Sequence, residues 1–248
     1  MAAPVTPAAP KPPHGRRFGL VYLGLAVVVG AAVGASIVLG SRAPRASHEW
    51  STWQPATRPD LRTKEIAAHV ADAYQFRPGE RMVDVVTGPP PTVSVLTEIA
   101  IPAAGAGLGQ DTTTYDASRA RLYILCGAGK NCSPAETIPG LLLRREALEL
   151  ALYTFEYVHD AESVVAFLPG TTREQPRNAI FFTRHDLAPQ LSHPLRTTLD
   201  QSRSPASASR TAAEARRVAK LTDKHRFRFA IAQTQGGGGL LVLDPLWP

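Results

Sequence analysis

The sequence predicts an α+β protein in which one N-terminal transmembrane helix, residues 18–40, is followed by a single domain with a mixed sheet. The first observation is an uncharged, apolar run near the N-terminus. The second is the roughly 200 residues that follow it, which are enough for one compact domain with its own core. The third is a long apolar helical pattern between two short apolar runs, the order of a strand–helix–strand unit.

Residues 1–17 form a tail rich in alanine and proline, which we expect to be disordered or extended. The tail carries Lys11, Arg16 and Arg17 and no acidic residue, so it holds half of the formal net charge of +6. The remaining 24 of the 27 basic residues nearly balance the 21 acidic ones. A balance of this kind gives no electrostatic footprint for nucleic acid, and we expect no nucleic-acid partner.

The run from Phe18 to Ser41 has no formally charged residue. As a helix it is about 36 Å long, and the hydrocarbon core of a bilayer is about 30 Å thick. A cleaved signal peptide is the main alternative, but its apolar part is usually about 7–15 residues long. We therefore expect a retained signal-anchor in the cell membrane. Because basic residues prevail on its N-terminal side, we expect a cytoplasmic tail and an extracytoplasmic C-terminal domain in a single-pass topology.

Small residues recur every four positions of the expected anchor, at Ala26, Gly30 and Gly34. Such a face lets two transmembrane helices approach closely, so it is a candidate surface for self-association within the lipid bilayer. Alanine and glycine are common throughout this segment, and composition alone is the alternative explanation.

The only two cysteines, Cys126 and Cys132, are separated by five residues that include Gly127 and Gly129. A loop of this length and flexibility can bring the two sulfur atoms to disulfide distance. We expect a structural disulfide, which fits an oxidising compartment and agrees with the charge bias. Two free thiols in a cytosolic loop are the alternative. A structural zinc site needs four ligands, and the sequence offers no further cysteine or closely spaced histidine pair, so we expect no metal.

Residues 41–59 read as a proline-containing linker, and residues 60–248 as the extracytoplasmic α+β domain. Trp50 and Trp53 lie in the linker, where they either rest at the level of the lipid headgroups or pack against the first helix of the domain. We expect that helix to begin at Asp60 as its N-cap, because apolar residues follow at a spacing of four.

The first half of the domain shows strand patterns. Met82–Val86 is a short apolar run, and Thr92–Ile101 alternates, with Val95 expected on the buried face. Ala103–Gly109 is small and glycine-rich, and we expect a loop there. Arg121–Leu125 is expected to be a further strand, which leads into the segment with the two cysteines.

The strongest helical pattern of the domain runs from Pro139 to Val158, and Ser163–Leu168 follows it as a short apolar strand. On this helix Arg145 and Glu149 are spaced to pair, and we expect the pair on the outer face. The strand that ends at Leu125, this helix and the next strand predict a βαβ crossover with parallel strands.

The last part of the chain combines strand, helix and hairpin patterns. Asn178–Thr183 reads as a strand, and Gln201–Ser209 is rich in serine and alanine and is expected to be mobile. Ala212–Thr222 reads as a short basic helix. Phe227–Gln233 and Leu240–Leu243 flank a run of glycines and predict a hairpin.

No set of residues carries a recognisable catalytic or cofactor signature, and we predict no catalytic residue and no cofactor. His159 and His185 each precede an aspartate, the arrangement of an oriented base, but no Gly-x-Ser-x-Gly motif supplies a nucleophile. Asp186 is expected instead to cap a short helix or turn that follows it.

A dense basic run lies near the C-terminus. Its members are Arg216, Arg217, Lys220, Lys224, Arg226 and Arg228. Such a run either meets anionic lipid headgroups or is simply the solvated face of a helix and a strand.

Three stretches resemble a group of uncharacterised bacterial single-pass membrane proteins. They are Leu122–Cys126 (LYILC), Arg144–Tyr153 (RREALELALY) and Phe181–Leu187 (FFTRHDL). The resemblance covers about half of the domain and implies an architecture, an anchor followed by one domain. It implies no activity.

These patterns favour a non-enzymatic, membrane-anchored protein whose extracytoplasmic domain binds another component of the cell envelope, such as an envelope protein. An envelope hydrolase that uses His185 or His159 is one alternative. A structural anchor that acts through pairing of transmembrane helices is the other.

Labelling of intact cells with a membrane-impermeant maleimide tests the topology and the disulfide together. We expect Cys126 and Cys132 to be labelled only after reduction, because a disulfide outside the cytoplasm blocks both thiols. Labelling that needs cell lysis and no reductant would place the domain in the cytoplasm and contradict both expectations.

Overall fold

A computed structural model describes residues 50–56, 58–59, 61–77, 79–90, 93, 95–103, 111–125, 138–170, 177–234 and 237–246. These residues belong to one compact unit, Glu49–Pro248. The expected anchor with Ala26, Gly30 and Gly34, and the expected disulfide between Cys126 and Cys132, lie outside the described residues. Within the described ranges, no helix is both long enough and apolar enough to cross a bilayer.

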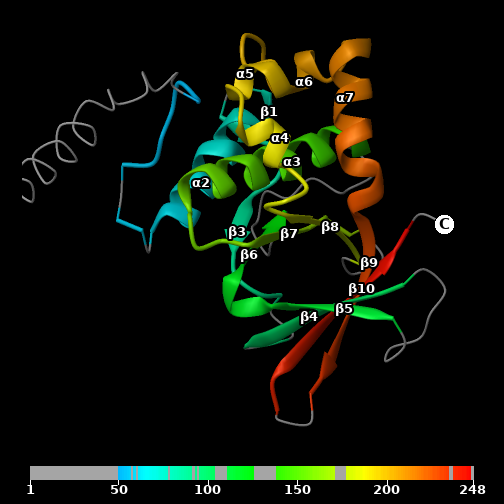
Figure 1. Cartoon of the computed structure of the whole chain (residues 1–248). Coiled ribbons are helices and arrows are strands. Elements are labelled where there is room, and N and C mark those ends of the chain that lie inside the picture. The colour runs from blue at the N-terminus through cyan, green and yellow to red at the C-terminus, as the bar shows by residue number, and fades with distance from the viewer. Residues whose placement is uncertain are drawn as a thin grey trace, which may run out of the picture. The chain divides into compact units, whose positions relative to one another are not determined.

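The predicted α+β fold with a mixed sheet is confirmed (Figure 1). In spatial order the eight strands are β3 (Val85–Thr87), β6 (Ala120–Leu125), β7 (Ser163–Phe167), β8 (Asn178–Thr183), β9 (Arg226–Gln233), β10 (Gly239–Pro245), β4 (Leu96–Pro102) and β5 (Thr112–Asp116). The pairs β6–β7 and β10–β4 are parallel, and the other pairs are antiparallel. A separate two-stranded ribbon consists of β1 (Gln75–Arg77) and β2 (Glu80–Arg81).

The helices gather beside strands β6 to β8, at the upper end of the domain in Figure 1. They are α2 (Arg62–Ala73), α3 (Gly140–Tyr157), α4 (Ala188–Leu191), α5 (Leu195–Thr198), α6 (Pro205–Ala208) and α7 (Ala212–Thr222), and the 3₁₀ turn η3 (Asp223–His225) follows α7. Another 3₁₀ turn, η1 (Ala117–Arg119), lies away from them and joins β5 to β6. The central helix, α3, is buried along most of its length because it packs on the sheet, on α2 and on α7. The parallel pairing of β6 with β7 around α3 confirms the predicted crossover.

The sheet curls back on itself, so that it has a core on each face. β5 is at one edge and β6 lies beside the opposite edge, yet only the three residues of η1 join them. The ring of Tyr115 in β5 lies 5.1 Å from that of Phe181 in β8, across the inside of the curl. Alternate residues therefore serve different cores. Phe181 belongs to the core inside the curl, whereas Phe182 belongs to the core under the helices.

One expectation about a strand is wrong, and one strand was not predicted. Val95 is 63% exposed, and Leu96 is buried in its place. The cause is an irregularity in the pairing of β10 with β4, which shifts the alternation by one residue. β5 has no counterpart in the sequence prediction, because its threonines lack the apolar alternation that marks a half-buried strand.

The expected mobile segment Gln201–Ser209 is ordered in the structure, which is a second correction. It contains α6, whose Pro205 and Ala208 are buried. The two tryptophans of the linker pack on the domain, the second of the two predicted alternatives. Trp53 stacks on His69 of α2, with the ring centroids 3.8 Å apart.

Substitution of Gly239 tests how closely β10 approaches the segment before β4. We expect Gly239→Ala to lower the free energy of unfolding by about 1–3 kcal/mol, because a Cβ there would clash with Val93 and come within 3.0 Å of the carbonyl oxygen of Val95. Gly140→Ala is the matched control. A Cβ at Gly140 meets open space at the first residue of α3, so the change should be neutral or slightly stabilising. Urea unfolding measures both, and equal stability of the two variants would contradict the close approach.

Candidate functional site

A groove of about 390 Å³ opens between the short helices α4 and α5 on one side and α7 on the other. Its lining residues are Pro189, Gln190, His193, Thr197, Thr198, Arg217, Lys220 and Leu221. We call it the basic groove, because its charged lining residues are cations from α7 and no carboxylate of the described ranges lines it. Pro189, Leu221 and the threonine methyl groups make part of the lining apolar.

The cations of the groove stand one turn apart on α7. Arg217 donates a hydrogen bond from Nη1 to the carbonyl oxygen of Thr198, over 3.2 Å, which holds the guanidinium across the groove. Lys220 has no hydrogen bond or ion pair with any residue of the described ranges. Both cations are therefore left with charge that no carboxylate of the described part of the chain neutralises.

The wall opposite α7 contains His193, in the turn between α4 and α5. Its Nδ1 lies 3.0 Å from the carbonyl oxygen of Pro189 and 2.9 Å from the hydroxyl of Ser192. The turn thus occupies Nδ1, and Nε2 is the ring nitrogen left for a ligand. Gln190 also lines this wall, and its buried Oε1 has no hydrogen-bond partner in the described residues.

A buried arginine of α3, Arg145, connects the segments that form the two walls of the groove. Arg145, with its side chain 2% exposed, donates from Nε to Oε1 of Glu214 in α7 (2.6 Å) and from Nη2 to the carbonyl oxygen of Asp200 (3.0 Å). The amide of Asp200 donates in turn to the other oxygen of Glu214 (2.9 Å). This ring of hydrogen bonds connects α3, the segment after α5 and the first turn of α7.

The third nitrogen of the Arg145 guanidinium, Nη1, faces the end of α2. Nη1 donates to Oε2 of Glu149 over 2.8 Å and to the hydroxyl of Tyr74 over 2.6 Å, and that hydroxyl donates to Oε2 of Glu149 over 2.7 Å. Burial raises the pKa of the Tyr74 hydroxyl and that of the Glu149 carboxyl. The predicted pairing of Arg145 with Glu149 is thus confirmed, but its predicted position on the outer face is wrong. Both side chains are inside, because α3 is covered on several sides.

The neighbouring arginine holds the other end of α7. Arg144 donates from Nε to the hydroxyl of Thr222 (2.7 Å) and from Nη2 to the carbonyl oxygen of Ala219 (3.1 Å) and the carboxylate of Asp223 (2.6 Å). Two consecutive residues of α3 therefore fix the first and last turns of α7. The direction in which α7 presents its cations to the groove follows from these contacts.

A third ionisable residue of α3, Glu146, has no such partners. Glu146 is fully buried, and neither of its carboxyl oxygens has a hydrogen bond with the described residues. Burial, and next the negative charge of Glu149, raise the pKa of the Glu146 carboxyl well above its usual value. Folding therefore favours the protonated form of Glu146, because an isolated buried carboxylate is far more costly.

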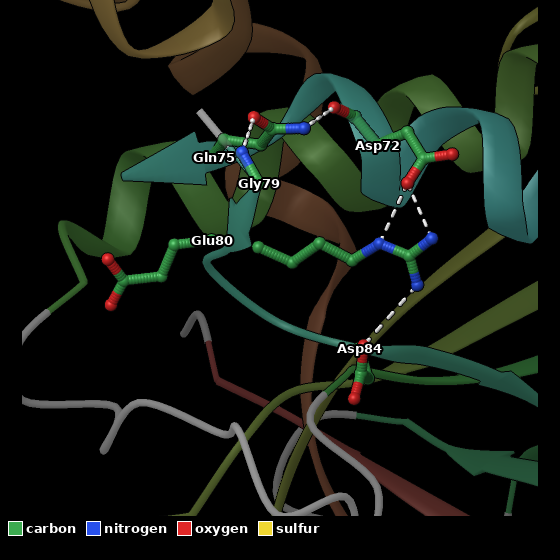
Figure 2. Close-up of a pocket in the computed structure, with 6 residues that line it drawn as sticks. Asp72, Gln75, Gly79, Glu80 and Asp84 are labelled. Carbon is green, nitrogen blue, oxygen red and sulfur yellow. Dashed lines mark hydrogen bonds and ion pairs between the residues drawn. The ribbon is translucent and has the colours of Figure 1, made fainter. Parts of the chain in front are cut away.

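A second, polar cleft of about 590 Å³ lies beside the β1–β2 ribbon (Figure 2). Its arginine, Arg81, is engaged by Asp72 at 2.5 and 2.8 Å and by Asp84 at 3.4 Å. Gln75 bridges the amide of Gly79 and the carbonyl oxygen of Asp72. These contacts tie the ribbon to α2, and they pair the polar side chains of the described lining with one another or with the backbone, apart from the carboxylate of Glu80. We interpret it as a structural clip, of modest strength because its ion pairs are exposed to solvent.

The histidines that the sequence singled out are both on the surface. His159 follows α3 and His185 lies in the turn after β8; both are exposed, and neither lines the basic groove or the polar cleft. Asp186 accepts hydrogen bonds from the amide and hydroxyl of Thr183 (2.7 and 2.6 Å). It therefore closes the turn after β8, which is one of the two roles predicted for it, and it does not cap α4.

In the described ranges, no three His, Cys, Asp or Glu side chains come together as metal ligands would.

The basic run near the C-terminus is divided by the fold. Arg217 and Lys220 line the groove, whereas Arg216, Lys224 and Arg228 are exposed elsewhere on the surface. Sequence reasoning had no signal for Arg145 as the centre of a buried network, since the same i, i+4 spacing occurs on solvated helices. It had none for the groove either, because α4 and α5 have four residues each.

In comparisons with protein-family models, with curated proteins and with solved structures, nothing matches this chain. The resemblance to uncharacterised single-pass membrane proteins stays a prediction. Function has to be argued from the geometry of this fold alone.

Neighbouring residues of α3 should respond in opposite ways to replacement by leucine. Arg145→Leu leaves Glu149 and Glu214 buried without their cation, and we expect a loss of about 3–5 kcal/mol in the free energy of unfolding. Glu146→Leu removes a buried carboxyl without partners, and we expect a gain of about 1–3 kcal/mol at pH 7.

The two variants should also differ in their dependence on pH. Above about pH 4.3 the unfolded chain releases the Glu146 proton and the folded chain keeps it, so this residue lowers stability as pH rises. Urea unfolding from pH 4 to 7 should show a flatter profile for Glu146→Leu than for the wild type. Arg216→Leu, at an exposed site of α7, is the control and should change stability by less than about 0.5 kcal/mol. A destabilised Glu146→Leu variant would show that this carboxyl has a partner in the folded state.

Proposed function

We propose that this chain is a non-enzymatic, single-pass membrane protein whose extracytoplasmic domain binds another component of the cell envelope through the basic groove. The observation that carries the proposal is the pair Arg217 and Lys220, which face a concave surface without any lining carboxylate. A ligand or partner with an anionic group complements this surface. The expected anchor of residues 18–40 supports the placement in the envelope.

The size and rigidity of the groove support binding. Its volume of about 390 Å³ lies in the range of about 300–1,000 Å³ that is usual for ligand sites. Arg144 and Arg145 hold α7 at both ends, and the contact of Arg217 with Thr198 fixes one cation before any ligand arrives. A site that is already ordered loses little conformational entropy when it binds.

The position of the candidate histidines favours binding over hydrolysis. A hydrolase needs a nucleophile within hydrogen-bond reach of an oriented base. His159 and His185 are exposed, and neither has a hydrogen bond to a serine, threonine or cysteine of the described ranges. For His159 and His185, the hydrolase alternative therefore rests on sequence adjacency to an aspartate alone.

Helix pairing through Ala26, Gly30 and Gly34 is compatible with binding and would strengthen it. Two paired anchors would present two grooves on one side of the membrane, and the second binding event would then be intramolecular. Bulky substitutions at Gly30 and Gly34 separate the two contributions, because they should abolish self-association without changing the groove itself.

Photo-crosslinking in cells tests the proposed function. A photoreactive phenylalanine analogue at Thr197 of the full-length chain should form an adduct with an envelope component, because this exposed side chain lines the groove. The same analogue at Glu80, in the polar cleft, is the positional control and should form none. Adding Arg217→Ala and Lys220→Ala should reduce the adduct at least about tenfold, since each charged hydrogen bond is worth about 1.5–3 kcal/mol.

Charge-matched variants guard against a nonspecific effect. Arg216→Ala with Lys224→Ala removes the same charge from the same region outside the groove, and it should leave the adduct unchanged. His159→Ala and His185→Ala should also leave it unchanged. The proposal is wrong if Thr197 and Glu80 give equal adducts, or if the two double variants lose them equally.

A further inference from the structure

We infer that the anionic group held by the basic groove is the phosphate of a lipid headgroup with a net negative charge, in the membrane to which the chain is proposed to be anchored. This inference rests on the proposed function and names its ligand class. It combines two features of the structure. One is the place where the linker enters the folded domain, and the other is the mixture of cations and apolar atoms in the groove.

The linker enters the domain beside α5. The carbonyl oxygen of Trp50 accepts a hydrogen bond from the amide of Leu195, the first residue of α5, over 2.7 Å. The indole of Trp50 also meets the rings of Tyr153 and Tyr157 edge-on, with centroids 5.6 and 6.0 Å away. The same short helix carries Thr197 of the groove lining, so the point of entry and the groove are only a few residues apart.

The entry point is held firmly by the three residues that follow Trp50. The hydroxyl of Ser51 is 2.9 Å from that of Tyr153, and the hydroxyl of Tyr157 donates to the carbonyl oxygen of Trp53 over 3.1 Å. Trp53 lies flat on His69, with ring planes only 2° apart. These contacts attach the chain to α2 and α3 from Trp50 onward.

The length of the remaining linker limits the distance from the groove to the bilayer. Only the stretch from Arg42 to Trp50 separates the uncharged run from the fixed entry point. Fully extended, these nine residues span at most about 30 Å. With residues 18–40 in the membrane, as proposed, this length sets an upper limit on the distance between the groove and the lipid headgroups, and it thereby raises their effective concentration at the groove.

The chemistry of the groove suits a phosphate that is attached to an apolar body. Arg217 offers the planar guanidinium that pairs with phosphate oxygens, and Lys220 adds a compact charge one turn away. Pro189 and Leu221 offer apolar contact to the glycerol and the first acyl carbons of a lipid. Inorganic phosphate would use the cations but not the apolar part of the lining.

Reconstitution of the full-length chain in lipid nanodiscs tests the inference. The photoreactive analogue at Thr197 is irradiated in nanodiscs of phosphatidylcholine alone, or of phosphatidylcholine and phosphatidylglycerol in equal parts. We expect the yield of lipid adduct, measured by mass spectrometry, to be at least about tenfold higher with phosphatidylglycerol. Arg217→Ala with Lys220→Ala should bring it to the level of phosphatidylcholine alone. Arg216→Ala with Lys224→Ala should keep it, and unfolding curves check that both double variants are folded.

Inorganic phosphate separates the two sources of the same chemistry. Millimolar inorganic phosphate should leave the adduct with phosphatidylglycerol intact. If phosphate abolishes the adduct, or if both lipid mixtures give equal yields, the lipid headgroup is not the ligand. A protein adduct in cells together with no lipid adduct in nanodiscs would overturn this inference and leave the proposed function standing. Adducts in neither experiment would overturn both.

Discussion

The helical half of this protein depends on one buried guanidinium, that of Arg145. Its nitrogens reach a carboxylate on α3, a tyrosine on α2, a carboxylate on α7 and the backbone after α5. Taking such a charge out of water costs several kcal/mol, and only a complete set of partners offsets it. Any arrangement of the helices that loses Glu149 or Glu214 leaves a buried charge alone. The network therefore disfavours alternative packings more than it adds to stability.

Order in the segment after α5 follows from the same network. The stretch Gln201–Ser209 has the composition of a mobile loop, but its two ends are held from outside. Asp200 is bonded through its amide to Glu214 and through its carbonyl oxygen to Arg145, while Pro205 and Ala208 of α6 are buried. Composition describes how a segment behaves when alone. Here tertiary contacts determine the conformation of the segment, and these contacts join residues that are far apart in the sequence.

The sequence predicts best those elements whose pattern repeats over several residues. β8 and α7 coincide with their predicted bounds, and α3 differs by one residue at each end, because apolar periodicity is an internal property of each segment. Val95 was placed on the wrong face, because an irregularity in the pairing of β4 with β10 shifts the alternation by one residue. The basic groove could not be predicted for a related reason. It forms where two four-residue helices meet α7, and nothing local to His193 or Arg217 encodes that meeting.

The two cations of the groove differ in their contacts with the rest of the domain. Arg217 is anchored to the backbone of Thr198, so its guanidinium is held in one direction, which would select the geometry of the proposed anion. Lys220 has no partner in the described part of the chain, so its ammonium can follow a mobile ligand and attract it before contact. Both stand on a helix that α3 holds at each end. If α7 were free to rotate, these two cations would no longer face the same groove. The buried network thus sets the position of both cations, although none of its described residues lines the groove.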